Sequence, residues 1–225
     1  MKIVVLPGLD GTGRLLSDFT ASLRKNFDVE IVSYPLDMTS YEEIRKWIGP
    51  RLRQDDYVIV AESFSGPVAI DITAQRPRGL LATVFVASFA RAPRKLPQNL
   101  LSLLKYVPHF PGMIAVVSRP FVTGQAASNA FAASYRSVLR EVPLSTLVDR
   151  LRAVSQVDLR ERLSEISVPC AYLRATKDRL VPIAISQDFN GHCQSLLPIE
   201  APHFVLQTKP EEAAERIAQF ISSLG

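Results

Sequence analysis

Cysteine and histidine are scarce in this chain of 225 residues, which contains two cysteines and three histidines. Two cysteines are too few for the disulfide framework of a small secreted protein. No Cys-x-x-Cys motif or His/Cys cluster points to a metal site. We therefore expect reduced, buried thiols at Cys170 and Cys193, and neither a metal nor another cofactor.

Long apolar runs are also missing. The longest stretch without a charged residue, 120–135, contains Ser, Thr, Gln and Asn, whereas a membrane-spanning helix needs about 20 apolar residues. Residues 1–6 form a short, mainly apolar run but lack the cleavage site of a secretory signal. These features predict a cytoplasmic protein without a membrane span.

Apolar residues are nevertheless plentiful, at 47% of the chain. This content supports a buried core and excludes a disordered chain. The scattered Pro and Gly residues exclude a coiled coil and collagen. The length suits one domain with an inserted lobe.

Basic residues are concentrated in one part of the chain. Residues 89–157 hold nine Lys or Arg and two acidic residues, a net charge of +7, so the remainder is negative although the whole chain carries +4. This asymmetry favours an anionic partner for the segment. The alternative is a solvated helix surface that happens to be rich in arginine. Nucleic acid is the least favoured partner, because the few aromatic residues of the segment show no stacking pattern.

Outside that segment, apolar runs alternate with helical patterns. Strands are expected at 1–6, 27–34, 57–61, 81–87, 170–175 and 195–200, and helices at 15–23, 41–52, 67–75, 182–190 and 211–224. Such alternation predicts an α/β fold with a parallel sheet covered by helices on both faces. Within 89–157 only helices are expected, at 96–107, 126–139 and 144–157. The prediction is a core of 1–88 and 158–225 with a helical cap at 89–157.

Three chemically suggestive residues follow expected strands. Ser63 lies in Ala-Glu-Ser-Phe-Ser-Gly (61–66), a variant of the nucleophile elbow G-x-S-x-G. Asp178 and His203 each lie in a loop after a later strand. Taken singly, they could be a helix N-cap, a surface acid and a loop histidine. Their order Ser, Asp, His at the carboxyl ends of parallel strands favours a catalytic triad.

With these motifs the sequence resembles the α/β-hydrolase superfamily over nearly its whole length. Residues 6–11 (Leu-Pro-Gly-Leu-Asp-Gly) look like its oxyanion loop, 177–182 (Lys-Asp-Arg-Leu-Val-Pro) like its acid loop, and Pro202-His203 like its histidine loop. Ala61 replaces the usual Gly of the elbow, and Pro7-Gly8 replaces the common His-Gly. The superfamily's first two strands have no counterpart, so the resemblance implies about six parallel strands.

The resemblance also implies the roles of the site residues. Ser63 would be the nucleophile, His203 the general base and Asp178 the residue that orients the histidine. The backbone N–H groups of Leu9 and Phe64 would form the oxyanion hole.

Fold and triad do not select the substrate. The cap is rich in Leu, Phe and Val, which suggests an apolar acyl pocket, and its arginines suggest an acidic feature on the substrate or its carrier. Size, triad order and basic cap are similar to those of the carrier-protein methyl ester esterases of biotin synthesis, whose partner is an acidic acyl carrier protein. The prediction is therefore a carboxylesterase for small or medium acyl esters. One possible substrate is pimeloyl-carrier-protein methyl ester. The expected contacts to the carrier are Arg136, Arg140, Arg150 and Arg152. Alternatives are an acyl thioesterase, a triad-based lyase or a non-catalytic binding protein of the same fold.

Overall fold

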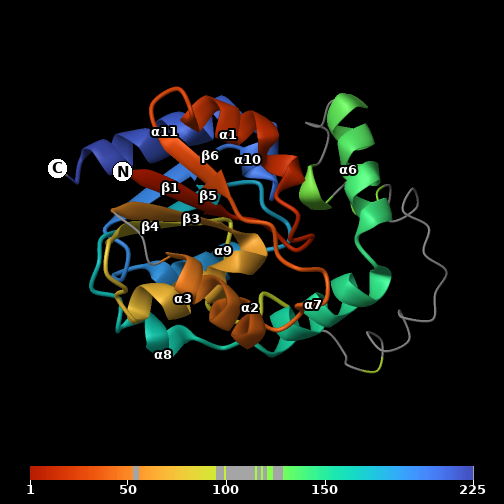
Figure 1. Ribbon diagram of the computed structural model, residues 1–225, viewed down its shortest axis with the longest axis horizontal. Coiled ribbons are helices and arrows are strands. Elements are labelled where there is room, and N and C mark those ends of the chain that lie inside the picture. The colour runs from red at the N-terminus through yellow and green to blue at the C-terminus, as the bar shows by residue number, and fades with distance from the viewer. Residues whose placement is uncertain are drawn as a thin grey trace.

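The computed structural model describes residues 1–52, 56–94, 99, 115, 118, 121–123 and 129–224. Its centre is a six-stranded sheet in which every neighbouring pair of strands is parallel (Figure 1). The strand order is β2-β1-β3-β4-β5-β6. The strands are β1 (Lys2–Leu6), β2 (Asp28–Ile31), β3 (Tyr57–Glu62), β4 (Leu80–Val86), β5 (Cys170–Ala175) and β6 (Ser195–Ile199). The expected parallel α/β sheet is confirmed.

The apolar runs form the middle of the sheet. Every residue of β3 is buried, and Val58, Ile59 and Val60 are completely inaccessible. Strands that are covered by helices on both faces read as continuous hydrophobic runs rather than as an alternating pattern. This explains why these strands were recognisable from composition alone.

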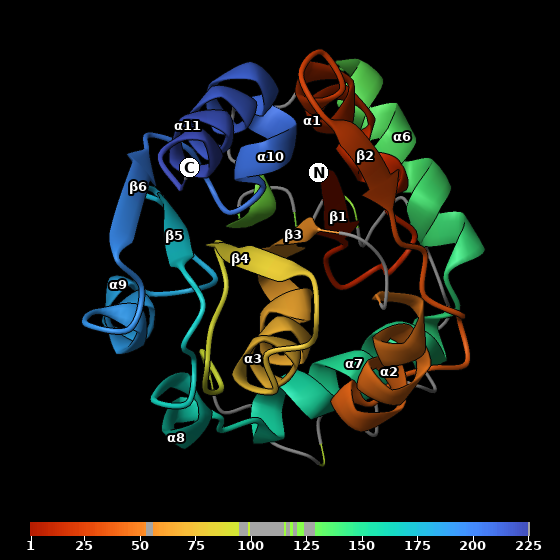
Figure 2. The same ribbon diagram turned by 60° about the vertical axis from the view of Figure 1, so that its left-hand side comes forward.

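Helices cover both faces of the sheet (Figure 2). One apolar layer contains residues of α1 (Ser17–Leu23), α10 (Val205–Thr208) and α11 (Pro210–Ser222). The other contains residues of α2 (Tyr41–Ile48), α3 (Gly66–Ala74) and α8 (Arg160–Leu163). Local signals fix the helix starts: Ser40 and Glu43 form a reciprocal capping box at α2, and Pro210 opens α11.

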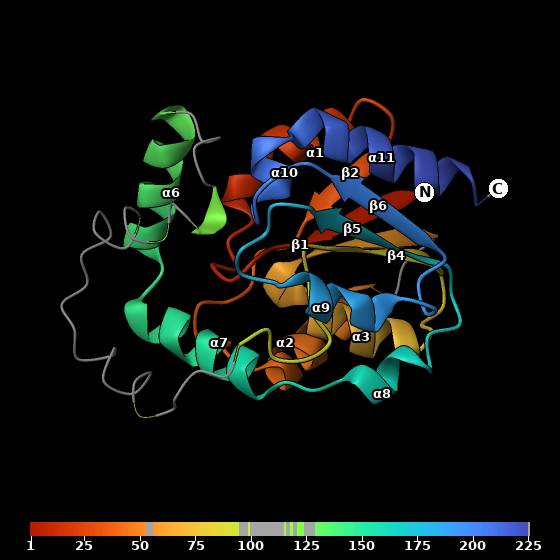
Figure 3. The same cartoon turned by 180° about the vertical axis from the view of Figure 1, so that it is seen from behind.

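Two further helices lie at the end of the molecule opposite the chain termini (Figures 1 and 3). They are α6 (Asn129–Glu141) and α7 (Leu144–Gln156), and they lie at the end of the sheet toward which the strands run. The helix expected at 96–107 falls almost wholly outside the described residues. The division into a core and a cap at 89–157 stays a prediction.

The chain leaves and rejoins the sheet layers at one place. Arg91 and Asp158 form an antiparallel bridge. On either side of it, the Ala92 N–H donates to the Val157 carbonyl at 2.9 Å and the Leu159 N–H to the Ala90 carbonyl at 2.7 Å. The ends of the segment that contains α6 and α7 are therefore neighbours.

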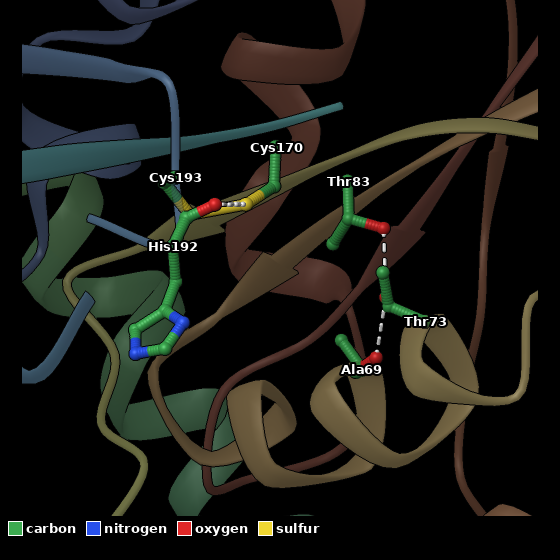
Figure 4. Close-up of a disulfide and its surroundings, with 6 residues drawn as sticks. All are labelled: Ala69, Thr73, Thr83, Cys170, His192 and Cys193. Atoms are coloured by element: carbon green, nitrogen blue, oxygen red, sulfur yellow. Dashed lines mark hydrogen bonds between the residues drawn. A yellow bond between two sulfur atoms is a disulfide. The ribbon is translucent and has the colours of Figure 1, made fainter. Parts of the chain in front are cut away.

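The expectation of two reduced thiols is wrong, because Cys170 and Cys193 form a disulfide (Figure 4). Their Cα atoms are 4.7 Å apart. The cause is the register of β5 and β6, in which Ala171 lies beside Ser195. This register brings Cys170, the first residue of β5, close to Cys193, which lies two residues before β6. The separation of 23 positions does not reveal this arrangement.

Figure 4 also shows how α3 is attached to the sheet. The Thr73 hydroxyl donates to the Ala69 carbonyl at 2.6 Å and lies 2.8 Å from the Thr83 hydroxyl of β4. Both threonines are fully buried, so each hydroxyl needs this partner. The contact fixes the position of α3, the helix that follows Ser63.

Candidate active site

Ser63 lies in the sharp turn between β3 and α3. Its φ angle is +44°, in the left-handed region that side chains other than glycine rarely adopt. The turn is tight because α3 starts directly against the end of β4: a Cβ atom on Gly66 would lie 1.6 Å from the Ser88 hydroxyl oxygen. That hydroxyl donates to the Ser63 carbonyl at 2.7 Å. The backbone has the strained geometry expected of a nucleophile elbow.

The structure brings Ser63, His203 and Asp178 into one hydrogen-bonded line. Ser63 Oγ is 2.9 Å from His203 Nε2, and His203 Nδ1 is 2.7 Å from Asp178 Oδ2. The three residues follow β3, β6 and β5, so they meet because the carboxyl ends of parallel strands share one edge of the sheet.

Backbone groups hold the Asp178 carboxylate in place. Its Oδ1 accepts hydrogen bonds from the N–H groups of Leu180 at 2.7 Å and Val181 at 2.9 Å, which leaves Oδ2 for His203. The side chains of His203 and Asp178 are only 4% and 6% exposed. A carboxylate fixed in this way favours a proton on Nδ1, so that Nε2 can accept the proton of Ser63.

The turn 8–11, which follows β1, lies beside this line. The Gly11 N–H donates to the Gly8 carbonyl at 3.0 Å, and the Tyr34 N–H donates to the Gly11 carbonyl at 2.8 Å. The Gly8 N–H donates to Glu62, next to Ser63, at 3.1 Å. Within the described part of the chain, the Leu9 N–H has no hydrogen-bond acceptor.

The second expected donor, the Phe64 N–H, belongs to the first turn of a short 3₁₀ helix (Ser63–Ser65). The first N–H groups of a helix have no partner within the helix. The N–H groups of Leu9 and Phe64 thus lie in the two segments that directly follow the neighbouring strands β1 and β3.

Comparison with solved structures identifies the architecture. The enol-lactonase from Burkholderia xenovorans superimposes with a TM-score of 0.86, at 14% sequence identity, over 98% of this chain and 91% of that one. The chain has the α/β-hydrolase fold. At this identity, the likeness concerns the fold alone.

Two sequence relatives of this α/β-hydrolase-fold chain are more similar to it in sequence than the enol-lactonase is, but neither reaches 30% identity. The pimeloyl-[acyl-carrier protein] methyl ester esterase of Vibrio campbellii is 24% identical, over 97% of this chain and 93% of that protein. The chloroplastic phytyl ester synthase 1 of Arabidopsis thaliana is 27% identical over 73% of this chain, but the match spans only 24% of that protein's length. No family model matches the sequence.

Glu62 is a site residue of this α/β-hydrolase fold that the sequence analysis missed. Its buried carboxylate accepts from the Gly8 N–H at 3.1 Å and from Gln207 Nε2 at 2.7 Å. Burial raises the pKa of Glu62 to about 7, and the nearby charge of Asp10 adds to this rise. The hydrogen bonds from Gln207 and Gly8 and the charge of His203 oppose it. Its signal was visible as an acid that ends an otherwise apolar strand.

An apolar wall adjoins His203. Phe131 and Tyr135 of α6 pack against Phe204, the residue after His203, with ring centroids 6.1 Å and 5.7 Å apart. Leu9 and Leu15 border the same cluster.

The described part of the chain contains no cluster of three or more His, Cys, Asp or Glu side chains that could bind a metal ion. None of its helices has the length and apolar character that a membrane span requires.

The structure corrects the expectation that Arg150 contacts a carrier protein. Arg150 of α7 is completely buried. Its guanidinium donates five hydrogen bonds, all to backbone carbonyls. An arginine has five N–H donors, so none remains for a partner or a substrate.

The other three arginines lie nearer the surface. Arg140 of α6 is exposed, and Arg136 on the same helix is half-buried. Arg152 of α7 forms an ion pair with Asp149 at 2.5 Å, which offsets part of its charge. Arg136 and Arg140 therefore remain as the stronger candidates for an anion contact.

Proposed function

We propose that this chain is a serine hydrolase that cleaves acyl esters through Ser63, His203 and Asp178. The observation that carries the proposal is the line of two hydrogen bonds, 2.9 Å and 2.7 Å long, that joins these side chains. The named activity of the pimeloyl-carrier-protein esterase supports it.

The proposed reaction has two halves. His203 Nε2 takes the Ser63 proton as Oγ attacks the ester carbonyl, and then returns that proton to the leaving alcohol. Water, activated by the same histidine, hydrolyses the acyl-enzyme and frees Ser63. Asp178 keeps the imidazole oriented and stabilises its protonated form.

The negative charge that develops on the substrate oxygen needs donors that are already in position. We assign this role to the backbone N–H groups of Leu9 and Phe64. The positive end of α3, which starts at the elbow, favours the same charge.

For the substrate, we propose an acyl ester carried by an acidic partner, of which pimeloyl-carrier-protein methyl ester is the model case. Support comes from the Vibrio relative, from the apolar wall of Phe131, Tyr135 and Phe204, and from the basic character of residues 89–157. The wall suits the acyl chain, and Arg136 and Arg140 suit the anionic carrier.

The similarity to phytyl ester synthase favours a second candidate, acyl transfer to an alcohol. The first half-reaction is the same, but an alcohol then replaces water as the acceptor. Adding a long-chain alcohol during turnover distinguishes the two activities, since a transferase forms the new ester whereas a hydrolase releases only the acid.

The proposed function is tested with p-nitrophenyl esters from acetate to laurate and with a fluorophosphonate probe. We expect turnover and covalent labelling in the wild type, and a loss of at least about 10³-fold in turnover with no labelling in Ser63→Ala. The control is Ser65→Ala, because Ser65 is fully buried and hydrogen-bonded to Pro7 and Tyr34; it should still be labelled. Labelling that survives in Ser63→Ala would remove Ser63 as the nucleophile.

A further inference from the structure

Arg150 is a buried cation whose hydrogen bonds, among the described residues, all go to backbone carbonyls. Its Nη1 donates to the carbonyls of Leu9 at 3.0 Å and Asp10 at 2.7 Å. Its Nη2 and Nε donate to Pro35 at 3.2 Å and to Met38 at 3.0 Å and 3.2 Å. One side chain thus joins α7 to the turn 8–11 and to the loop before α2.

Burying a guanidinium is costly, and the cost is tolerable only when every N–H group is hydrogen-bonded. Here all five are. The guanidinium carbon also lies 6.0 Å from the Tyr34 ring centroid and 5.8 Å from that of Phe64, within reach of a cation–π attraction. The positive charge therefore lies close to both residues, Leu9 and Phe64, that we assign to the oxyanion hole.

The turn 8–11 is held from two sides. The Gly8 carbonyl accepts from the Gly11 N–H within the turn, and the Gly11 carbonyl accepts from the Tyr34 N–H of the core. Arg150 engages the two carbonyls that remain, those of Leu9 and Asp10. All four carbonyls of the turn are thus occupied. The Leu9 N–H is free among the described residues, and its direction is fixed by the bonds around it.

The fit between Arg150 and the turn leaves no spare room. Gly11 has a φ angle of +75°, and a Cβ atom there would lie 2.3 Å from Arg150 Nη1. The turn thus has the one residue type that permits both its backbone conformation and the close approach of the guanidinium.

We propose that Arg150 is a positioning residue for ester hydrolysis, which holds the Leu9 N–H in the orientation that stabilises the oxyanion. This proposal rests on the proposed function. Arg150 touches no substrate atom; it acts through the backbone of the turn. A helix of the segment 89–157 would thereby contribute to the chemistry as well as to substrate selection.

The test compares Arg150→Met with Thr146→Val, a control on the same helix. The Thr146 hydroxyl donates to the Leu36 carbonyl at 2.8 Å, so its loss weakens the attachment of α7 without touching the turn 8–11. We expect kcat for p-nitrophenyl esters to fall about 10²-fold in Arg150→Met, the usual effect of losing one oxyanion-hole donor, with KM within about threefold. Thr146→Val should keep kcat within about twofold.

An alkylboronic acid provides a second readout, because it forms an anionic tetrahedral adduct with an active serine. Its inhibition constant should rise about as much as kcat/KM falls, since both depend on the oxyanion hole. A merely destabilised enzyme would lose active protein but keep the inhibition constant of the remaining fraction. Added guanidinium at millimolar concentration should restore part of kcat in Arg150→Ala and have no such effect on Thr146→Val.

If Arg150→Met does not accumulate as folded protein, Arg150→Lys is compared with the wild type instead. Lysine keeps the charge but lacks the planar fork that spans the carbonyls, so kcat should fall at least about tenfold. A wild-type kcat and boronate affinity in Arg150→Met or Arg150→Lys, with Ser63→Ala inactive, would overturn the proposal for Arg150 alone. A wild-type protein that hydrolyses no ester would overturn both proposals.

Discussion

At the scale of single residues, the site depends on polar groups that are buried and fully engaged. Glu62, the residue before Ser63, shows this most clearly, because its buried carboxylate accepts hydrogen bonds from both the turn 8–11 and Gln207 of α10. A carboxylate in this position is less stable when ionised than it would be in water. Its protonation is therefore coupled to the stability of the fold.

We predict that Glu62→Gln removes a pH-dependent part of the stability. The pKa of Glu62 is raised to about 7 by burial, so between pH 4.5 and 7 the folded state binds a proton that the unfolded state has released. Stability from this group is consequently lost as the pH rises through that range, by up to about 3 kcal/mol. The difference in the free energy of unfolding, Glu62→Gln minus wild type, should therefore increase from pH 5 to pH 8. Urea titrations at both pH values measure it.

Glu200→Gln is the matched control for this prediction. Glu200 is exposed, and the hydrogen bond and charge of Lys177 lower its pKa. It stays ionised from pH 5 to pH 8, so its variant should differ from wild type by the same amount at both values. An equally constant difference for Glu62→Gln would contradict the coupling.

At the scale of elements, α6 and α7 have different parts in the site. The inward face of α6 supplies Phe131 and Tyr135 to the apolar wall. Its two arginines lie one turn apart, Arg136 half-buried and Arg140 exposed. Helix α7 instead sends an arginine inward. A net charge counted along the sequence treats these arginines alike, although only the exposed ones can attract a partner.

We predict that Arg136→Glu/Arg140→Glu lowers kcat/KM for an acyl-carrier-protein ester about tenfold at low ionic strength and leaves small p-nitrophenyl esters unchanged. The reason is that charge steering acts on the encounter with an anionic partner and is screened by salt. The measurement is kcat/KM for both substrates at two salt concentrations. Arg160→Glu on the distant α8, where Arg160 pairs with Asp158, is the control. An equal loss on both substrates would show that the two arginines serve the fold.

The helices also show where sequence reasoning was limited. The pattern at 144–157 predicted α7 to within a residue, because helical periodicity and Pro143 mark it. It did not predict that Arg150 points inward, since this depends on which carbonyls the neighbouring loops present. The carbonyls of Leu9, Asp10, Pro35 and Met38 come together around one position only once those loops have folded.

At the scale of the whole molecule, parallel topology explains what was predictable. Ser63, Asp178 and His203 are up to 140 positions apart, yet they could be grouped in advance because each follows a recognisable strand and all strands end at one edge. Cys170 and Cys193 could not be paired in advance, because they lie at the opposite edge of the sheet, Cys170 as the first residue of β5 and Cys193 two residues before β6. Their pairing depends on the register of β5 with β6.

We predict that reduction of the Cys170–Cys193 bond destabilises the fold without abolishing it. Closing a loop of this length stabilises a protein by about 3 kcal/mol in the chain-entropy model, which corresponds to a Tm about 6–12 °C higher for a chain of this size. Calorimetry with and without a reductant measures the shift. Cys193→Ser should show no response to the reductant, and a wild-type Tm that does not change would contradict the prediction.

The bridge between Arg91 and Asp158 has a consequence for how such enzymes diversify. Because the chain departs from the sheet and returns to it at adjacent positions, the intervening segment can be lengthened, shortened or exchanged without shifting a strand. In this protein, however, exchanging the segment would also remove Arg150. The replacement segment would have to support the turn 8–11 in another way. A change of segment would therefore alter the substrate range and the catalytic rate together.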